Sequence, residues 1–233
     1  TPTVVAVVGL RRVGKSVLLR QFVERLNSRG TVIYIDKEDL SFDAVASDHD
    51  LVAHVAHKRR AGTRTYVIVD EVQLVERWER AVASLQNRDD THVIISGSSS
   101  ALLSGELATR LAGRYTTFRV LPLSLREFEK LQEALHGDAP ESEALLNQYR
   151  RLGGLPGLLH TDLVDDVTTQ MQRDIYHTIA LRDVVSRHAV RDVGTMEAVT
   201  RFAMDNVGNL TTAKRIVDYM KQHGRRATVD SVI

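Results

Sequence analysis

Two glycines, a lysine and a serine near the start of the chain have the types and spacing needed to hold a phosphate group. They lie in the segment GLRRVGKS, residues 9–16, which fits the pattern G-x-x-x-x-G-K-S. Gly9 and Gly14 permit backbone conformations and a close approach that a Cβ would block, so successive N–H groups can face a phosphate. Lys15 would reach the β- and γ-phosphates as a point charge, and the Ser16 hydroxyl would take one position around Mg²⁺. The residues expected to contact a nucleotide are Gly9, Arg11, Arg12, Val13, Gly14, Lys15, Ser16 and Val17.

The runs on either side of this segment favour the same interpretation. The apolar run Thr3–Val8 precedes the segment, and the helical run Val17–Leu26 follows it. A helix that begins beneath bound phosphates adds partial positive charge there. The alternative is an ordinary glycine-rich turn between a strand and a helix, which the flanking elements together with the eight-residue match disfavour.

Two adjacent acids end another apolar strand and have the chemistry of a metal and water site. Asp70 and Glu71 follow the apolar residues Tyr66–Val69. In open α/β sheets, ligands bind at the carboxyl ends of the strands. We expect Asp70 to hold magnesium through water, and Glu71 to orient or deprotonate an attacking water. The alternative is a strand that simply ends in solvated acids.

Serines and arginines farther along the chain are the remaining candidates for contacts with the reacting phosphate. After the strand His92–Ser96, we expect Ser98 to hydrogen-bond the attacking water or the γ-phosphate, with Ser96 as the second choice. A cluster that caps a following helix is the alternative for these serines. Arg110 or Arg114 would reach the γ-phosphate of a neighbouring subunit, which requires an oligomer. Surface solvation or an internal salt bridge is the alternative for either arginine.

The distribution of apolar residues indicates an α/β fold followed by helices. Up to residue 123, short β-branched runs alternate with amphipathic stretches, which is typical of a parallel sheet with helices on both faces. The apolar runs are continuous, which indicates strands covered on both faces. The expected strands are Thr3–Val8, Thr31–Ile35, Tyr66–Val69, His92–Ser96 and Thr116–Leu121. The expected later helices are Arg126–Leu135, Ser142–Leu152, Leu163–Ala180, Thr195–Asn206 and Thr212–Gln222.

This pattern predicts three parts in the chain. They are an α/β core at residues 1–123, a small helical lid at 124–170 and a helical connector with a further helical unit at 171–233. The apolar run at the very start and an unfinished helical stretch at the end suggest a fragment of a longer protein.

Composition excludes several classes of protein. The 233 residues, of which 43% are hydrophobic, can bury a proper core. The absence of cysteine excludes a disulfide scaffold and a thiolate zinc site, and it fits a reducing cytoplasm. The formal net charge of +1 argues against a protein that coats nucleic acid generally. No apolar run approaches the roughly 18–20 residues needed to span a bilayer, so we expect no membrane segment and a cytoplasmic location.

The motifs taken together resemble a known family. The segments GLRRVGKS, YVIVDEVQ, IISGSSS, LAGRY and LPLSLREF are similar, in order and spacing, to prokaryotic AAA+-type ATPases that join an AAA_14 core to a C-terminal DUF4143 region. The resemblance implies a five-stranded parallel sheet of order 5-1-4-3-2, ATP or ADP with Mg²⁺ as ligands, and Glu71 as a catalytic residue. It also makes Arg114 the better candidate for an arginine finger, the arginine that reaches the γ-phosphate of a neighbouring subunit. The segment Gly153–Pro156 is similar to the G-x-P element of related signalling ATPases, which implies that Pro156 packs against adenine.

The end of the chain resembles the later parts of the same family. Residues 175–184 look like its helical connector, and residues 210–229 look like the first helices of a winged helix-turn-helix that is incomplete at Ile233. Such a unit packs against protein or binds DNA. Residues 173–233 carry ten Lys or Arg against seven Asp or Glu, which is compatible with DNA contact but not diagnostic of it.

The function expected from these features is hydrolysis of Mg-ATP that drives a conformational change in an attached C-terminal region. One alternative is a regulatory switch that hydrolyses ATP slowly and transmits the nucleotide state through Pro156. Another is a DNA-binding module that uses the nucleotide as a structural ligand. A homo-oligomer is expected wherever an arginine acts on a neighbouring subunit.

Overall fold

The described part of the chain forms two compact units. The computed structural model describes residues 3–98, 102, 113–137, 141–159, 165–178, 185, 192–225 and 228–229. The units comprise residues 1–168 and 169–233, and each is described by itself. The predicted division into 1–123, 124–170 and 171–233 is finer than these two units and stays a prediction.

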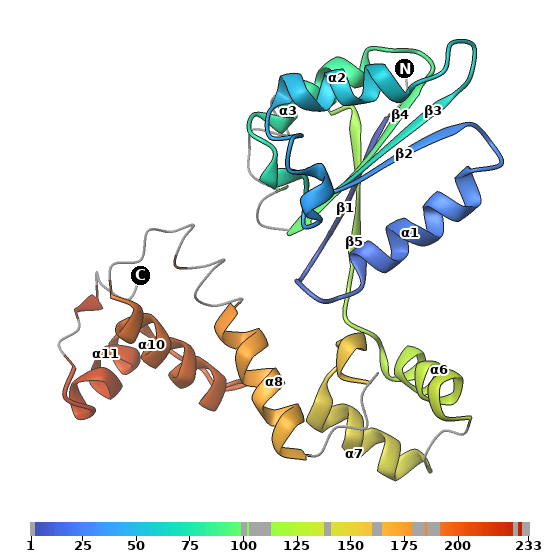
Figure 1. Ribbon diagram of the computed structural model, residues 1–233. Helices are drawn as coiled ribbons and strands as arrows, with labels where there is room; N and C mark the ends of the chain where they lie inside the picture. Colours follow the sequence, from blue (N-terminus) through green and yellow to red (C-terminus); the bar gives the residue numbers. More distant parts are fainter. Residues whose placement is uncertain are drawn as a thin grey trace. The chain divides into compact units, whose positions relative to one another are not determined.

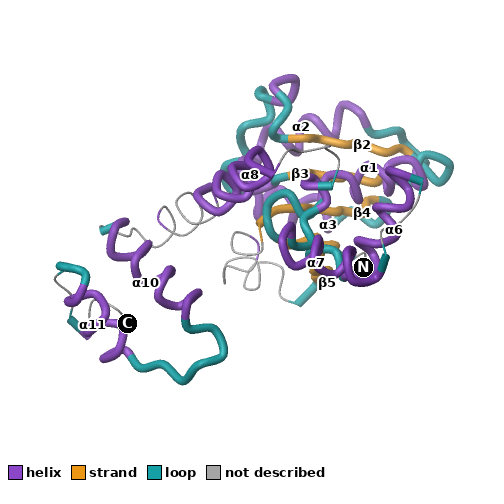
Figure 2. Tube along the Cα trace, turned by 90° about the horizontal axis from the view of Figure 1, so that it is seen from below, coloured by secondary structure: helices purple, strands orange, loops and turns teal. Residues whose placement is uncertain are grey.

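The first unit is built on a parallel five-stranded sheet. Its strands are β1 (Val4–Gly9), β2 (Thr31–Asp36), β3 (Thr65–Asp70), β4 (Thr91–Ser98) and β5 (Tyr115–Val120). They are arranged in the order β2-β3-β4-β1-β5, and every pair is parallel (Figures 1 and 2). The predicted α/β fold and the sheet order 5-1-4-3-2 are therefore confirmed.

Different helices cover the two faces of the sheet (Figure 1). α1 (Lys15–Leu26) packs Leu19 against Val7 and Ile68 on one face. α2 (Asp48–Lys58) and α3 (Trp78–Gln86) cover the other face, where a larger core gathers alternate strand residues. The inner strands β1, β3 and β4 therefore carry nearly continuous apolar runs, whereas the edge strand β5 is mostly exposed and mixes polar with apolar residues, unlike the predicted continuous run.

Short elements and two further helices complete the first unit. Two single-turn 3₁₀ helices follow the ends of β2 and β3, η1 (Leu40–Phe42) and η2 (Val72–Leu74). After β5 the chain forms α6 (Leu125–His136), α7 (Ser142–Leu152) and η3 (Pro156–Leu158). The helices α6 and α7 bury a separate small core of Phe128, Leu145, Leu152 and Leu159.

Helix α8 (Asp165–His177) crosses the boundary between the units, and the second unit also contains α10 (Val193–Asp205) and α11 (Ala213–Gln222). These last two helices pack through Val217 and Met220, and the rings of Phe202 and Tyr219 lie 5.0 Å apart. The Thr212 side chain caps α11 by accepting a hydrogen bond from the Arg215 N–H. Of the two helices, only α11 lies within residues 210–229, where the winged helix-turn-helix is predicted to begin, and that unit stays a prediction. In the ranges described, none of the helices combines the length and the apolar composition that crossing a membrane requires.

Two element boundaries differ from the predicted ones in a way that matters for the site. α1 begins at Lys15, two residues earlier than predicted, because Gly14 takes a left-handed conformation that serves as its N-cap. β4 extends through Gly97 to Ser98, two residues beyond the predicted end, because it stays paired with β1 up to Gly9.

Gly154, in the segment that follows α7, is held close to the connection that follows β5. The Leu123 N–H donates to the Gly154 carbonyl at 2.7 Å, and the Tyr149 hydroxyl donates to the Leu123 carbonyl at 2.8 Å. A Cβ at Gly154 would overlap the Leu123 carbonyl oxygen. Only glycine therefore allows this close approach.

We expect Gly154→Ala to lower the free energy of unfolding by about 1–3 kcal/mol, because the added methyl group forces the lid segment away from Leu123. Gly157→Ala is the matched control, since a Cβ there would meet no atom within 4 Å. Chemical denaturation of the parent and both variants measures the effect. Equal stability of the two variants would contradict the proposed close approach.

Candidate functional site

The glycine-rich segment GLRRVGKS joins the end of β1 to the start of α1. Gly14 has φ 99° and ψ 15°, a conformation that side chains disfavour, and Lys15 is the first residue of the helix. The first N–H groups of an α-helix have no acceptor within the helix, so those of Lys15 and Ser16 can meet an anion. In the preceding loop Arg12 is also left-handed, with φ 63°, and Val13 is buried. The side chain of Val17 is exposed, so its contribution to a ligand would come from the backbone.

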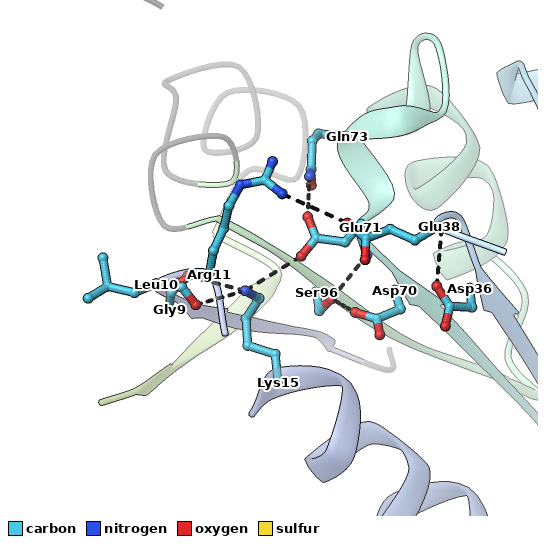
Figure 3. A network of polar contacts seen from close by, with 10 residues as sticks. All are labelled: Gly9, Leu10, Arg11, Lys15, Asp36, Glu38, Asp70, Glu71, Gln73 and Ser96. Carbon is cyan, nitrogen blue, oxygen red and sulfur yellow. Dashed lines mark hydrogen bonds and ion pairs between the residues drawn. The ribbon is translucent and has the colours of Figure 1, made fainter. Parts of the chain in front are cut away.

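Lys15 is a buried charge with three partners (Figure 3). Its residue is only 4% exposed. The Nζ atom donates to the carbonyl oxygens of Gly9 at 3.3 Å and Leu10 at 3.1 Å, and it lies 3.5 Å from Glu71 Oε1. Burial of an ammonium group is tolerable only with such partners. Lys15 therefore connects the glycine-rich segment to the second predicted acid.

Asp70 ends β3 and is wholly buried. One carboxylate oxygen accepts a short hydrogen bond from Ser96 Oγ, and the other accepts from the Tyr34 hydroxyl at 3.2 Å. The two donors come from β4 and β2, the strands on either side of β3. The orientation of this predicted metal-binding acid is thus fixed from both neighbouring strands.

Glu71 has an unusual backbone conformation for a residue with a side chain. Its φ of 53° and ψ of 49° lie in the left-handed region, which costs on the order of 1–3 kcal/mol. Its N–H donates to Ser96 Oγ at 3.1 Å, so one serine hydroxyl contacts both acids. The Glu71 carboxylate lies between Lys15 on one side and Gln73 on the other, and Gln73 Nε2 donates to Oε2 at 2.5 Å (Figure 3).

The structure places the two candidate serines differently. Ser96, the second choice, is wholly buried and holds Asp70 and Glu71. Ser98, the first choice, ends β4 and is the register partner of Gly9. The pairing of Val69 with Ile95 sets Asp70 opposite Ser96, and this register is a property of the assembled sheet.

Two residues of the site were not predicted, Tyr34 and Gln73. Tyr34 lies near the end of β2, and no motif distinguishes it from other residues of a buried strand. Gln73 stands two residues after Glu71 in the segment YVIVDEVQ, so its position was visible although no role followed from it. Only its contact with Glu71 gives it a role.

Arg114 lies at the other end of the sheet. It directly precedes β5, and its carbonyl oxygen accepts from the Val4 N–H at 3.1 Å and from Gln86 Nε2 at 2.8 Å. Strand β5 has 6 residues, which separates the two sheet edges by roughly 20 Å. Arg114 therefore does not lie beside Lys15 of its own chain. Arg110 falls outside the described residues.

Pro156 lies near the glycine-rich segment GLRRVGKS. A Cβ built on Gly14 would be 4.0 Å from Pro156 Cγ. The structure thus brings together Gly14 and the predicted adenine-contacting proline, although they are far apart in the sequence.

The phenol of Tyr34 has a raised pKa. Burial, followed by the nearby charge of Asp70, raises it from 10.0 to about 12. The folded state therefore retains the phenol proton over a pH range in which the unfolded chain has lost it. The stability that this group contributes is present below pH 10 and is lost as the pH rises through about 12.

We expect the parent to lose stability relative to Tyr34→Phe as the pH rises from 10 to about 12. The free energy of unfolding of the parent, minus that of the variant, should therefore fall over this range. Phenylalanine has no proton to lose, so the variant lacks this contribution to the pH dependence. Denaturation curves of both proteins across that range give the difference. A difference that stays constant over the whole range would disprove the assignment.

Comparison with known proteins agrees with this geometry. The AAA_14 family model, described as an AAA domain, matches residues 1–129. An uncharacterized protein of Haemophilus influenzae is 33% identical over 218 residues, which cover 89% of this chain and 52% of the relative. The chain spans about half the length of the curated relatives it matches.

Solved structures share the fold at low sequence identity. A Walker-type ATPase of Pyrococcus abyssi superposes with a TM-score of 0.59 and 17% identity, over 98% of this chain and 81% of its own. A RuvB mutant of Thermotoga maritima gives a TM-score of 0.52 and 13% identity, over 99% of this chain and 77% of its own. The chain therefore belongs to the AAA_14 family of AAA domains and has the fold of a AAA+-type P-loop NTPase.

Proposed function

We propose that this chain binds ATP with Mg²⁺ and hydrolyses it. The observation that carries the proposal is the contact of Lys15 with both the glycine-rich segment and Glu71, beside the buried Asp70. A lysine in this position can bind the β- and γ-phosphates, and an adjacent acid can act on water. A protein that only binds nucleotide has no need of the second acid.

The residues present fit a magnesium ion. Mg²⁺ prefers hard oxygen ligands and is usually held by one or two protein groups together with substrate phosphates and water. Ser16 in the first turn of α1 and Asp70 at the end of β3 offer such oxygens. When bound, the ion would neutralise charge on the phosphates.

The contacts of Lys15 suggest how nucleotide binding prepares Glu71. In the structure the ammonium group is held by two backbone carbonyls and by Glu71 Oε1. Phosphate oxygens carry more charge than those carbonyls and compete for the same three N–H donors. When the Lys15 ammonium group binds the phosphates instead, Glu71 Oε1 is able to accept a proton from water.

We expect Glu71→Gln to lower the steady rate of phosphate release by about 10²-fold or more, while ATP still binds. Lys15→Ala should lose nucleotide binding itself, because it removes the charge that meets the phosphates. A coupled phosphate assay and calorimetry measure the two effects.

The matched control is Glu38→Gln. Glu38 is an exposed acid in the connection after β2 whose Oε1 lies 3.8 Å from Arg11 Nη1, so its loss tests a general change of charge near the site. Turnover in Glu71→Gln equal to that of the parent would overturn the catalytic assignment. ATP binding by Lys15→Ala with the affinity of the parent would overturn the phosphate site.

A slow regulatory switch is the second candidate, and the position of Pro156 favours it. Pro156 lies beside Gly14, while Gly154 is bonded to Leu123 after β5. A nucleotide base that packs on Pro156 would therefore be linked to the lid helices. This arrangement supports transmission of the nucleotide state from the phosphate site to the lid.

If the protein is a switch, ADP should co-purify with it, and Pro156→Ala should release ADP about 10-fold faster, because the base loses its packing surface. Gly157→Ala, at the next position, should release ADP at the rate of the parent. Stopped-flow displacement of a fluorescent nucleotide measures these rates. An empty site that exchanges nucleotide rapidly would count against the switch.

Further parts of the function rest on regions beyond this site. Because Arg114 lies at the opposite sheet edge from Lys15, its finger role requires a neighbouring subunit, and we propose a homo-oligomer in which it serves the next site. ATP hydrolysis would then move an attached C-terminal region. The helices α10 and α11 would provide contacts to a protein or DNA partner.

A further inference from the structure

The side chain of Gln73 has a contact that the proposed mechanism does not yet use. Its Nε2 donates to Glu71 Oε2, the carboxylate oxygen that faces away from Lys15 (Figure 3). We propose that Gln73 is a positioning residue that holds the Glu71 carboxylate for its reaction with water, and that Gly97 provides the space for it. This inference rests on the proposed ATPase function.

The orientation of the Gln73 amide follows from charge. An ionised carboxylate only accepts hydrogen bonds, so the amide nitrogen rather than the amide oxygen must face Glu71. The amide oxygen then points away from Glu71 and is buried, without a hydrogen-bond partner among the described residues. A buried carbonyl without a partner is unfavourable. The contact of the amide nitrogen with the charged Glu71 carboxylate offsets part of this cost.

Gly97 explains why the Gln73 side chain can lie where it does. Gly97 is part of β4, the next residue after Ser96. A Cβ at Gly97 would overlap Gln73 Oε1 and would crowd the Leu102 side chain at 3.1 Å. Glycine at this position thus leaves the space that the amide oxygen occupies. A larger residue would push Gln73 away from Glu71.

Gln73 matters most after nucleotide has bound. Lys15 and Gln73 hold the two oxygens of the Glu71 carboxylate. If Lys15 turns to the phosphates, Gln73 is the donor that still fixes the carboxylate through Oε2. The other oxygen, Oε1, is then presented to water in a defined direction. Loss of such positioning slows a reaction without weakening ATP binding, because Gln73 need not contact the nucleotide.

The test compares Gln73→Met, which keeps the size but removes the donor, with Gln73→Glu, which places a like charge beside Glu71. Gln73→Met should lower kcat about 10- to 100-fold with little change in the ATP dissociation constant. Gln73→Glu should lower kcat further. Gly97→Ala should behave like Gln73→Met, because it displaces the same amide. Gln21→Met, on an exposed position of α1, is the matched control and should keep the kcat of the parent.

Two further measurements separate positioning from a general structural defect. Gln73→Met should add nothing to the loss of single-turnover rate in a Glu71→Gln background, since it acts through Glu71. In the nucleotide-free protein, one side-chain amide proton of Gln73 should resonate downfield, and this shift should disappear in Glu71→Ala. Thermal unfolding of each variant checks that it is folded.

Different results identify which proposal fails. If the parent releases no phosphate, the ATPase function fails and the inference about Gln73 fails with it. If the parent hydrolyses ATP and Glu71→Gln does not, but a folded Gln73→Met keeps the kcat of the parent, the ATPase function stands and the inference is overturned. A Gln73 effect that is fully additive with Glu71→Gln also overturns it.

Discussion

The site depends on the contacts that surround the buried ammonium group of Lys15. A charge removed from water must be compensated, and here two loop carbonyls and the Glu71 carboxylate surround it. Through these contacts Lys15, at the start of α1, binds the Gly9 and Leu10 carbonyls of its own loop and also the acid that directly follows β3. The three N–H donors of the Lys15 ammonium group thus link the glycine-rich loop to Glu71.

The strands on either side of β3 hold the two acids of the site in place. Because β3 lies between β2 and β4, Asp70 receives one hydroxyl from each side, from Tyr34 and from Ser96. The same Ser96 hydroxyl accepts the N–H of Glu71 and so helps to hold its strained left-handed backbone. Strain of this kind persists only where the surroundings determine it strongly. In this conformation Glu71 Oε1 lies 3.5 Å from Lys15 Nζ.

A second connection leads from the glycine-rich segment GLRRVGKS to the segment around Pro156. The strand β5 pairs with β1 up to Gly9, and the residues that follow it hold Gly154 through Leu123. The chain then returns to Gly14 at Pro156. The glycine-rich loop therefore lies near the segment that the connection after β5 holds in place. Helices α6 and α7 share their own small core.

The sequence by itself determined the fold class, the order of strands and helices, and the identity of Lys15, Asp70 and Glu71 as neighbours, because periodic apolar runs and motif spacing are local properties of the chain. Resemblance to a known family supplied the sheet order, which no local pattern contains. Only the tertiary structure decided that Ser96 contacts both acids, that Tyr34 and Gln73 belong to the site, and that Arg114 lies at the far edge of the sheet. These facts depend on strand register and on which strands are neighbours, and both are set when distant segments pack together to bury their apolar faces.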